Sequence, residues 1–185
     1  MEDMWQGIKI RLRTPTLDDM DGYFSLPESK NTASQRSGDR VHFPVSKEQM
    51  RMRMDEFAKM NPMGDEYFLL METPDKQVVG NINAHSADRF EGTFSYGIAV
   101  LPQHQGKGYA SEAIRLLLRY FFNELGFQKC NAQAYSFNPD SMRLHERFGF
   151  VLEGRLRRNH FSGGERCDVM CYGITREEFR EKYGK

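Results

Sequence analysis

The pattern of apolar and polar positions along the chain predicts a sheet covered by helices. Residues 8–12 alternate between apolar and polar side chains, which is the period of a half-buried strand. Beyond residue 109, apolar residues return every three or four positions, which is the period of a helix lying on a sheet. These residues are Ala110, Ala113, Ile114, Leu117, Leu118 and Phe121.

Turn and cap residues delimit the other elements. Strands are expected over residues 66–72, 77–83, 93–100, 129–137, 151–158 and 167–175. Helices are expected after Thr16, over 47–60 behind the cap Ser46, over 139–149 behind the cap Asn138, and over 176–183. Residues 27–44 lack periodicity and predict a long loop, of the kind that often forms a lid or binding loop. Because a helix connects strands 93–100 and 129–137, these two strands should be parallel neighbours.

Length and composition narrow the class of protein. The 185 residues suit one domain spanning 1–185, with one core. Lys plus Arg and Asp plus Glu both number 26, and a balanced charge disfavours a nucleic-acid partner. No apolar run approaches the roughly 20 residues of a membrane helix, and the first residues do not resemble a secretory signal. We therefore expect a cytoplasmic protein without a membrane partner.

The cysteines do not suggest a disulfide framework or a metal site. Cys130, Cys167 and Cys171 form an odd set without a CxxC pair. Cys130 lies in a strand pattern, where it is expected to pack as a small apolar residue. No metal is expected.

The stretch 103–110 carries the strongest functional signal, since it joins a strand to a helix through two glycines. The start of a helix presents unpaired backbone N–H groups and the positive end of the helix dipole, which together bind phosphate. Gly106 and Gly108 remove side chains that would block a ligand from this backbone. The Walker pattern and the GxGxxG pattern are both absent. A simple strand-to-helix turn remains an alternative.

The sequence around this loop resembles the GCN5-related N-acetyltransferase family. The family's pyrophosphate loop, Gln/Arg-x-x-Gly-x-Gly/Ala, is matched by Gln103, Gly106 and Gly108. The later motifs Glu112-Ala113, Asn138-x-x-Ser141 and 146–150 are also similar to the family's. Glu153-Gly154 and Asp168 are similar to its ribosomal-protein and small-amine branch. The likeness covers residues 66–175, whereas residues 1–65 match only in the order of elements.

The resemblance implies an α/β fold and a cosubstrate. The family fold is a mixed, mostly antiparallel sheet of about seven strands with a central splayed parallel pair, flanked by about four helices. Acetyl-CoA would lie between the splayed strands, with its pantetheine arm along Ile98 and Val100 and its pyrophosphate at the amides of 105–110. The implied coenzyme residues are Ile98, Ala99, Val100, Gln103, Gln105, Gly106, Lys107, Gly108, Tyr109, Ala110 and Asn138. For Lys107, a solvated side chain is the preferred interpretation.

The resemblance also implies direct attack of an amine on the thioester. The N–H of Ile98 or Ala99 would polarise the carbonyl. Three residues could serve the departing thiolate, and each has a structural alternative: Asn138 as a helix cap, Ser141 as a first-turn serine bonded to backbone, and His145 as a structural histidine. His145 stands where many relatives carry a tyrosine general acid.

The general base and the acceptor are less well defined. His160 and His85 are the candidate bases, with an exposed surface histidine as the alternative for both. The carboxylates of Glu66, Glu72 and Glu91 could bind a cation or relay a proton. The acceptor is expected to be a primary amine, either a protein N-terminus or a small amine, and the resemblance implies a homodimer. A catalytically weak acetyl-CoA sensor and an unrelated nucleotide-binding protein remain as other classes.

Overall fold

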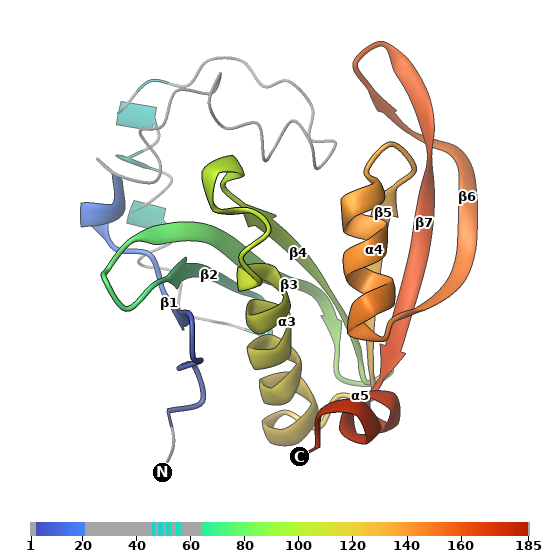
Figure 1. Ribbon diagram of the computed structural model, residues 1–185, viewed down its shortest axis with the longest axis horizontal. Helices are drawn as coiled ribbons and strands as arrows, with labels where there is room; N and C mark the ends of the chain where they lie inside the picture. Colours follow the sequence, from blue (N-terminus) through green and yellow to red (C-terminus); the bar gives the residue numbers. More distant parts are fainter. Residues whose placement is uncertain are drawn as a thin grey trace.

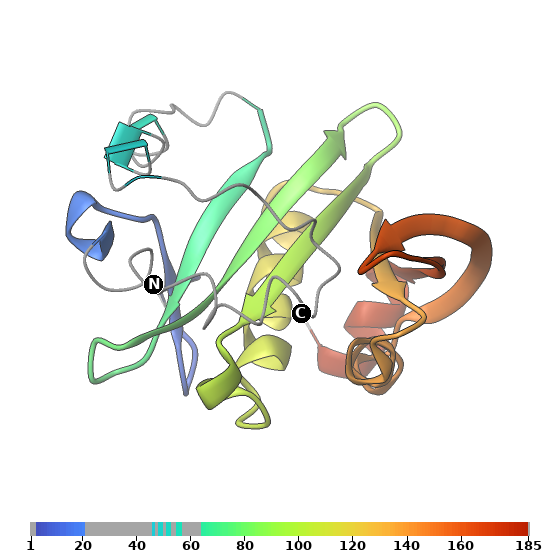
Figure 2. The same cartoon turned by 90° about the horizontal axis from the view of Figure 1, so that it is seen from above.

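A seven-stranded mixed sheet forms the centre of the computed structural model, which describes residues 3–20, 46, 48–49, 51–52, 55–56 and 64–184. The strand order is β1-β2-β3-β4-β5-β7-β6, and only β4 and β5 run parallel among the described strands (Figures 1 and 2). The strands are β1 Arg11–Arg13, β2 Tyr67–Glu72, β3 Val78–Asp88, β4 Thr93–Val100, β5 Lys129–Tyr135, β6 Val151–Ser162 and β7 Glu165–Thr175.

Three α-helices described along their whole length, and several short turns, accompany these strands, and the described residues 48–49, 51–52 and 55–56 are helical as well. The helices are α3 Tyr109–Arg119, α4 Pro139–Phe148 and α5 Arg176–Tyr183. The short turns are η1 Leu17–Met20, η3 Pro102–His104 and the π-helical turn η4 Tyr120–Glu124, which continues α3. None of the helices described is long and apolar enough to cross a membrane.

Helix ends follow the cap chemistry of the sequence. The side chain of Asn138 accepts a hydrogen bond from the amide of Ser141 at 3.1 Å, and Pro139 occupies the first turn of α4. Gly149 ends α4 with a φ of 112°, a conformation that glycine adopts without strain. Thr175 starts α5 with a reciprocal capping box to Glu178.

The apolar stripe of α3 packs on the sheet and forms much of the core. Ile114, Leu117 and Phe121 are fully buried. The ring of Phe121 stacks on that of Phe94 from β4, with centroids 4.0 Å apart. This packing fixes the start of α3, and therefore the glycine loop before it, relative to β4.

The pairing of β4 with β5 is short, and this opens the sheet at its centre. Register pairs join Thr93–Ser95 to Lys129–Asn131 only, and beyond them the two strands separate. On their outer sides β4 stays paired with β3, and β5 with β7, up to the ends of both strands. The expected parallel splayed pair is confirmed, and so is the expected fold class.

Several element boundaries differ from those expected. The first strand is Arg11–Arg13 rather than residues 8–12, because residues 7–9 form a turn held against α3. β3 continues past residue 83 to Asp88, with an irregularity in its pairing after His85, so that His85 lies within the strand. The loop 27–44 and most of the helix expected over 47–60 lie outside the described residues. At the start of the latter, Ser46 and Gln49 bond reciprocally.

Candidate active site

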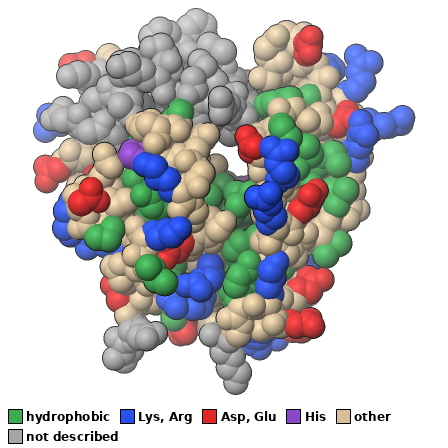
Figure 3. Space-filling view, viewed as in Figure 1, with side chains coloured by type: hydrophobic (Ala, Val, Ile, Leu, Met, Phe, Trp, Pro, Cys, Tyr) green, Lys and Arg blue, Asp and Glu red, His purple; other side chains and the backbone are tan. Residues whose placement is uncertain are grey.

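A cleft of about 1280 Å³ occupies the opening between β4 and β5. One wall is built by β3, β4, the glycine loop and the start of α3, and the other by β5 and α4. Figure 3 shows the hollow in the molecular surface, with Lys and Arg side chains gathered on both sides of it. Arg143 and Arg147 of α4 are among the lining residues. The cleft therefore combines positive charge with a backbone edge of β4 that has no partner among the described strands, and this combination suits a long anionic ligand.

The glycine loop lies at one side of the cleft. Gly106 and Gly108 have φ angles of 76° and 86°, in the left-handed region that favours glycine. Gly108 is the N-cap of α3, and no side chain among the described residues caps this helix end. Within this part of the chain, the first amides of α3 therefore have no intrahelical or side-chain partner. Such a helix end binds phosphate.

Most of the expected coenzyme residues meet in this cleft. Those among its lining residues are Ile98, Ala99, Val100, Gln105, Gly106, Gly108, Tyr109, Ala110 and Asn138. Gln103 and Lys107 are not among them. The Gln105 side chain donates to the carbonyl of Val100 at 3.2 Å, which ties the loop back to the end of β4.

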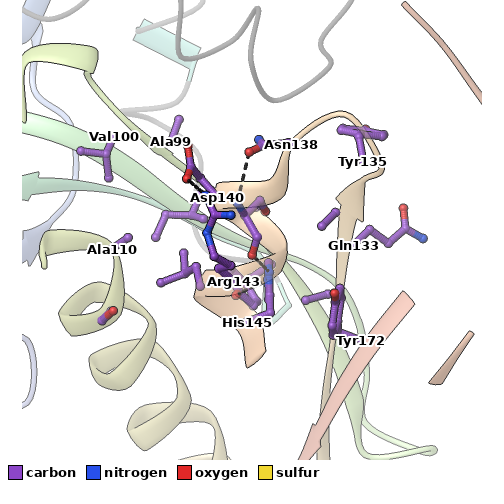
Figure 4. Close-up of a pocket in the computed structure, with 18 of the residues that line it drawn as sticks. Ala99, Val100, Ala110, Gln133, Tyr135, Asn138, Asp140, Arg143, His145 and Tyr172 are labelled. Carbon is purple, nitrogen blue, oxygen red and sulfur yellow. Dashed lines mark hydrogen bonds and ion pairs between the residues drawn. The ribbon is translucent and has the colours of Figure 1, made fainter. Parts of the chain in front are cut away.

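The first turn of α4 faces the glycine loop across the cleft (Figure 4). Asn138 uses its side-chain oxygen as the helix cap. Ser141 is half-buried and lines the cleft, and its hydroxyl makes no hydrogen bond within the part of the chain that is described. Ser141 therefore has a proton to donate to a group in the cleft.

His145 lies one turn further along α4, where it is 3% exposed. Its Nδ1 lies 2.7 Å from the Ser141 carbonyl, and its Nε2 lies 2.8 Å from the Tyr96 hydroxyl. Because a carbonyl can only accept, Nδ1 carries the proton, and Nε2 then accepts from Tyr96. Burial lowers the pKa of His145, which favours this neutral form, and the ring stacks on Tyr172 with centroids 5.2 Å apart.

The two candidate bases lie in different places. His85 is exposed on β3 and lines the cleft, on the same side of the strand as Asn81 and Asn83. Its Nδ1 lies 3.1 Å from the hydroxyl of Ser86. His160 of β6 is not among the lining residues. Its ring packs at a tilt against that of Tyr135, which does line the cleft, with centroids 4.1 Å apart.

Two of the three candidate carboxylates make specific protein contacts. Glu72 is 4% exposed and binds Arg11 and Arg13. Burial alone would raise the pKa of Glu72, but the hydrogen bonds from these arginines hold it below its usual value. Glu66 accepts from the amide of Ser86 at 3.1 Å. Neither carboxylate lines the cleft, and nor does Glu91. Within the described residues, no group of His, Cys, Asp or Glu is arranged to hold a metal ion.

Several lining residues were not anticipated from the sequence. Tyr96 had a signal for burial, since it alternates with Phe94 and Ile98, but nothing local indicated its bond to His145. Arg143 and Arg147 are four residues apart on α4, and that spacing would have placed them on one helix face. The sequence did not indicate that this face borders the cleft.

A sheet that parts around a parallel pair, with a glycine loop at the opening, matches the architecture expected of the acetyltransferase family that the sequence resembles. The chain belongs to the family described as acetyltransferase (GNAT) domain, whose match spans residues 9–151. It is 39% identical over 180 residues to the SPbeta prophage-derived uncharacterized N-acetyltransferase YokL of Bacillus subtilis (strain 168), covering 97% of each chain. It is also 31% identical over 110 residues to the spermidine N(1)-acetyltransferase of Vibrio cholerae, covering 60% of this chain and 64% of that protein.

Solved structures share the fold. A crystal structure of a probable acetyltransferase has a TM-score of 0.82 at 22% identity, covering 93% of this chain and 96% of that one. The spermidine N-acetyltransferase of Vibrio cholerae in complex with CoA and spermine has a TM-score of 0.79 at 23% identity, covering 94% and 99%. The protein is therefore an acetyl-CoA-dependent N-acetyltransferase.

Proposed function

We propose that this protein transfers the acetyl group of acetyl-CoA to a primary amine, of a protein N-terminus or a small molecule, by direct attack in a ternary complex. The observation that carries the proposal is the separation of β4 from β5 beyond Ser95, opposite a helix start that no described side chain caps. The opening exposes the inner edge of β4 to a ligand. The uncapped helix start supplies amides for the phosphates of that ligand.

The coenzyme residues follow from this arrangement. The diphosphate would lie against the amides of residues 105–110, and the pantetheine arm would run along Ile98 and Val100. Arg147 borders the same cleft and would add positive charge beside the phosphates, whereas Arg143 is paired with Asp140. The cleft residues therefore fit a nucleotide thioester both in shape and in charge.

The chemistry requires one bond to form and one to break. The amine nitrogen attacks the thioester carbon while the N–H of Ile98 or Ala99 binds the carbonyl oxygen, and the C–S bond then breaks. Ser141 would donate a hydrogen bond to the departing sulfur and relay to it the proton that the attacking nitrogen loses, so that the serine hydroxyl is restored; this hydroxyl is half-buried and has no protein acceptor among the described residues. Asn138 would hold Ser141 in place through the α4 cap. His145, as placed, supports this turn by donating to the Ser141 carbonyl.

The acceptor would enter over β3 and β4. Asn81, Asn83 and His85 present polar side chains to the cleft there. A Cβ at Gly97 would meet the side-chain oxygen of Asn83 at 2.6 Å, so glycine lets that amide lie close over β4. We assign proton removal from the incoming amine to His85, directly or through water, because it lines the cleft.

The described cleft also bears on the acceptor's charge. Its two lining carboxylates are both in ion pairs, Asp140 with Arg143 and Glu153 with Lys129. Neither is therefore available as a lone partner for a polycation. A monoamine is favoured over a polyamine on this ground.

Two measurements test the proposal. A thermal-shift series with acetyl-CoA, CoA, ATP and NAD should show stabilisation by the first two alone. Thiol release from acetyl-CoA should then depend on an added amine, in a panel of peptides, monoamines and polyamines. If acetyl-CoA binds but no amine in the panel is acetylated, the proposed transfer would be wrong and the protein would act as an acetyl-CoA sensor. If only ATP or NAD stabilises the protein, the proposed coenzyme site would be wrong.

A pair of variants tests the assignment of His85 as the general base. His85→Ala should lower turnover with little effect on acetyl-CoA affinity, and His160→Ala should have the smaller effect. The reverse order would move the assignment to His160.

A further inference from the structure

The N-terminal turn at residues 7–9 is hydrogen-bonded to the first turn of α3. The Glu112 carboxylate of α3 accepts hydrogen bonds from the amide of Lys9, at 2.9 Å, and from the amide of Ile8. A Cβ at Gly7 would overlap this carboxylate, so glycine is required for the close approach. Figure 2 shows the N-terminal segment beside the glycine loop, although the two are far apart in sequence.

The hydrogen bonds between this turn and α3 place the Lys9 ammonium against the glycine loop. Its Nζ donates to the carbonyl of Lys107 at 2.8 Å, and it lies 2.8 Å from the position that a Cβ on Gly108 would occupy. Within the described residues, Lys9 forms no ion pair that would compete for its charge. Gly106 and Gly108 border the cleft, whereas Lys9 does not.

The geometry of a peptide bond links this contact to the cleft. In a trans peptide the carbonyl and the following N–H point in opposite directions, and no peptide bond in the described chain is cis. Neither Lys9 nor Lys107 lines the cleft, so we infer that their bond draws the Lys107 carbonyl away from it and leaves the Gly108 N–H directed to the opposite side. Glycine at 108, with a φ of 86°, would also tolerate the flipped peptide, which would turn a carbonyl oxygen toward an anionic ligand.

We propose that Lys9 is a positioning residue for cosubstrate binding: it holds the Lys107–Gly108 peptide so that the loop presents N–H groups, and no carbonyl, to the diphosphate of acetyl-CoA. The inference rests on the proposed placement of the coenzyme. The Lys9 ammonium, bonded to the carbonyl oxygen, also polarises the peptide group, and this strengthens the peptide N–H as a hydrogen-bond donor. Lys9 acts through the loop and needs no contact with the reacting atoms.

The test compares a full and a truncated thioester. Lys9→Met removes the ammonium and keeps the length of the side chain, and Lys9→Arg restores a charged donor. The matched control is Lys182→Met, since Lys182 also donates to a backbone carbonyl, that of Arg147, at 2.7 Å. Each variant is assayed for acetyl-CoA affinity by calorimetry, and for acetyl transfer from acetyl-CoA and from S-acetyl-N-acetylcysteamine, a thioester without a diphosphate.

Lys9→Met should weaken acetyl-CoA binding about tenfold, the equivalent of about 1.4 kcal/mol. Its turnover with the short thioester should match that of the unchanged protein, Lys9→Arg should recover most of the loss, and Lys182→Met should show none. A Lys9→Met protein that binds acetyl-CoA normally would overturn the inference, and so would an equal loss with both thioesters, which would indicate general destabilisation. Failure of the unchanged protein to bind acetyl-CoA would instead overturn the proposed function.

Discussion

The hydroxyl of Tyr96 on β4 donates a 2.8 Å hydrogen bond to Nε2 of His145 on α4. Tyr96 is the first β4 residue beyond the pairing with β5, and α4 follows directly on β5. The bond therefore joins the two sides of the split sheet at the point where they part. Both residues are buried, and burial, with a smaller contribution from Cys130, raises the pKa of Tyr96, so the phenol stays protonated.

Removing the Tyr96 hydroxyl should destabilise the fold. Tyr96→Phe leaves a buried imidazole nitrogen without a donor, which costs about 1–3 kcal/mol. Urea unfolding measures the loss. Tyr172→Phe is the control, because the partner of its hydroxyl, Glu146, is exposed and can bind water instead. An equal loss of unfolding free energy in both variants would mean that the hydrogen bond between Tyr96 and His145 contributes no more to stability than that of Tyr172.

Stability should fall on mild acidification because of His145. Its pKa is lowered in the folded protein, so the unfolded chain binds the proton more readily. The stability is present above the unfolded pKa of about 6.5 and is lost as the pH falls toward the lowered folded value, by about 1.4 kcal/mol for each unit between the two. Urea unfolding at a series of pH values from 7.5 downward should show a shallower loss for His145→Gln. Parallel curves would contradict the neutral state of His145.

Ser141→Ala should affect turnover more than binding. Loss of a proton donor to the thiolate should lower kcat by about 100-fold, with acetyl-CoA affinity unchanged. Steady-state kinetics and calorimetry measure the two effects separately. Ser162→Ala, at the β6–β7 turn, is the control. Undiminished kcat in Ser141→Ala would remove this residue from the thiolate role.

Gly108→Glu should abolish acetyl-CoA binding. The new side chain would meet the Lys9 ammonium, would strain a φ of 86°, and would place a negative charge at the start of α3. Gly164→Glu makes the same change at another left-handed glycine, where a Cβ has open space around it. Calorimetry should show loss of acetyl-CoA affinity in the first variant alone, and retained affinity would rule out the loop as the phosphate site.

The elements that the sequence predicted best are those with a strong local signal. β4 matches its predicted bounds, and α5 spans the predicted 176–183, where the structure adds a capping box at Thr175. β3 was predicted too short, since its last residues pair with β4 through an irregular register that has no period in the sequence. The turn at residues 7–9 was read as strand because Ile8 and Ile10 alternate with polar residues, yet Ile8 is 85% exposed.

The residues of the candidate site also fall into those with a local sequence signal and those without one. The glycine loop and the Asn138 cap were predicted because a few consecutive residues specify each of them. Tyr96 and Lys9 were missed because their partners lie 49 and 98 residues away. Nothing near either residue in the sequence indicates such a partner.

By itself the sequence determined the kinds of elements, their order and the glycine loop at the start of α3, because backbone conformation at glycines, caps and periodic apolar faces is set by neighbours along the chain. Only the tertiary structure decided where β4 and β5 part, which histidine faces the cleft, and that His145 is a neutral acceptor for Tyr96. Those properties depend on register and burial, which arise when distant segments pack together and exclude water.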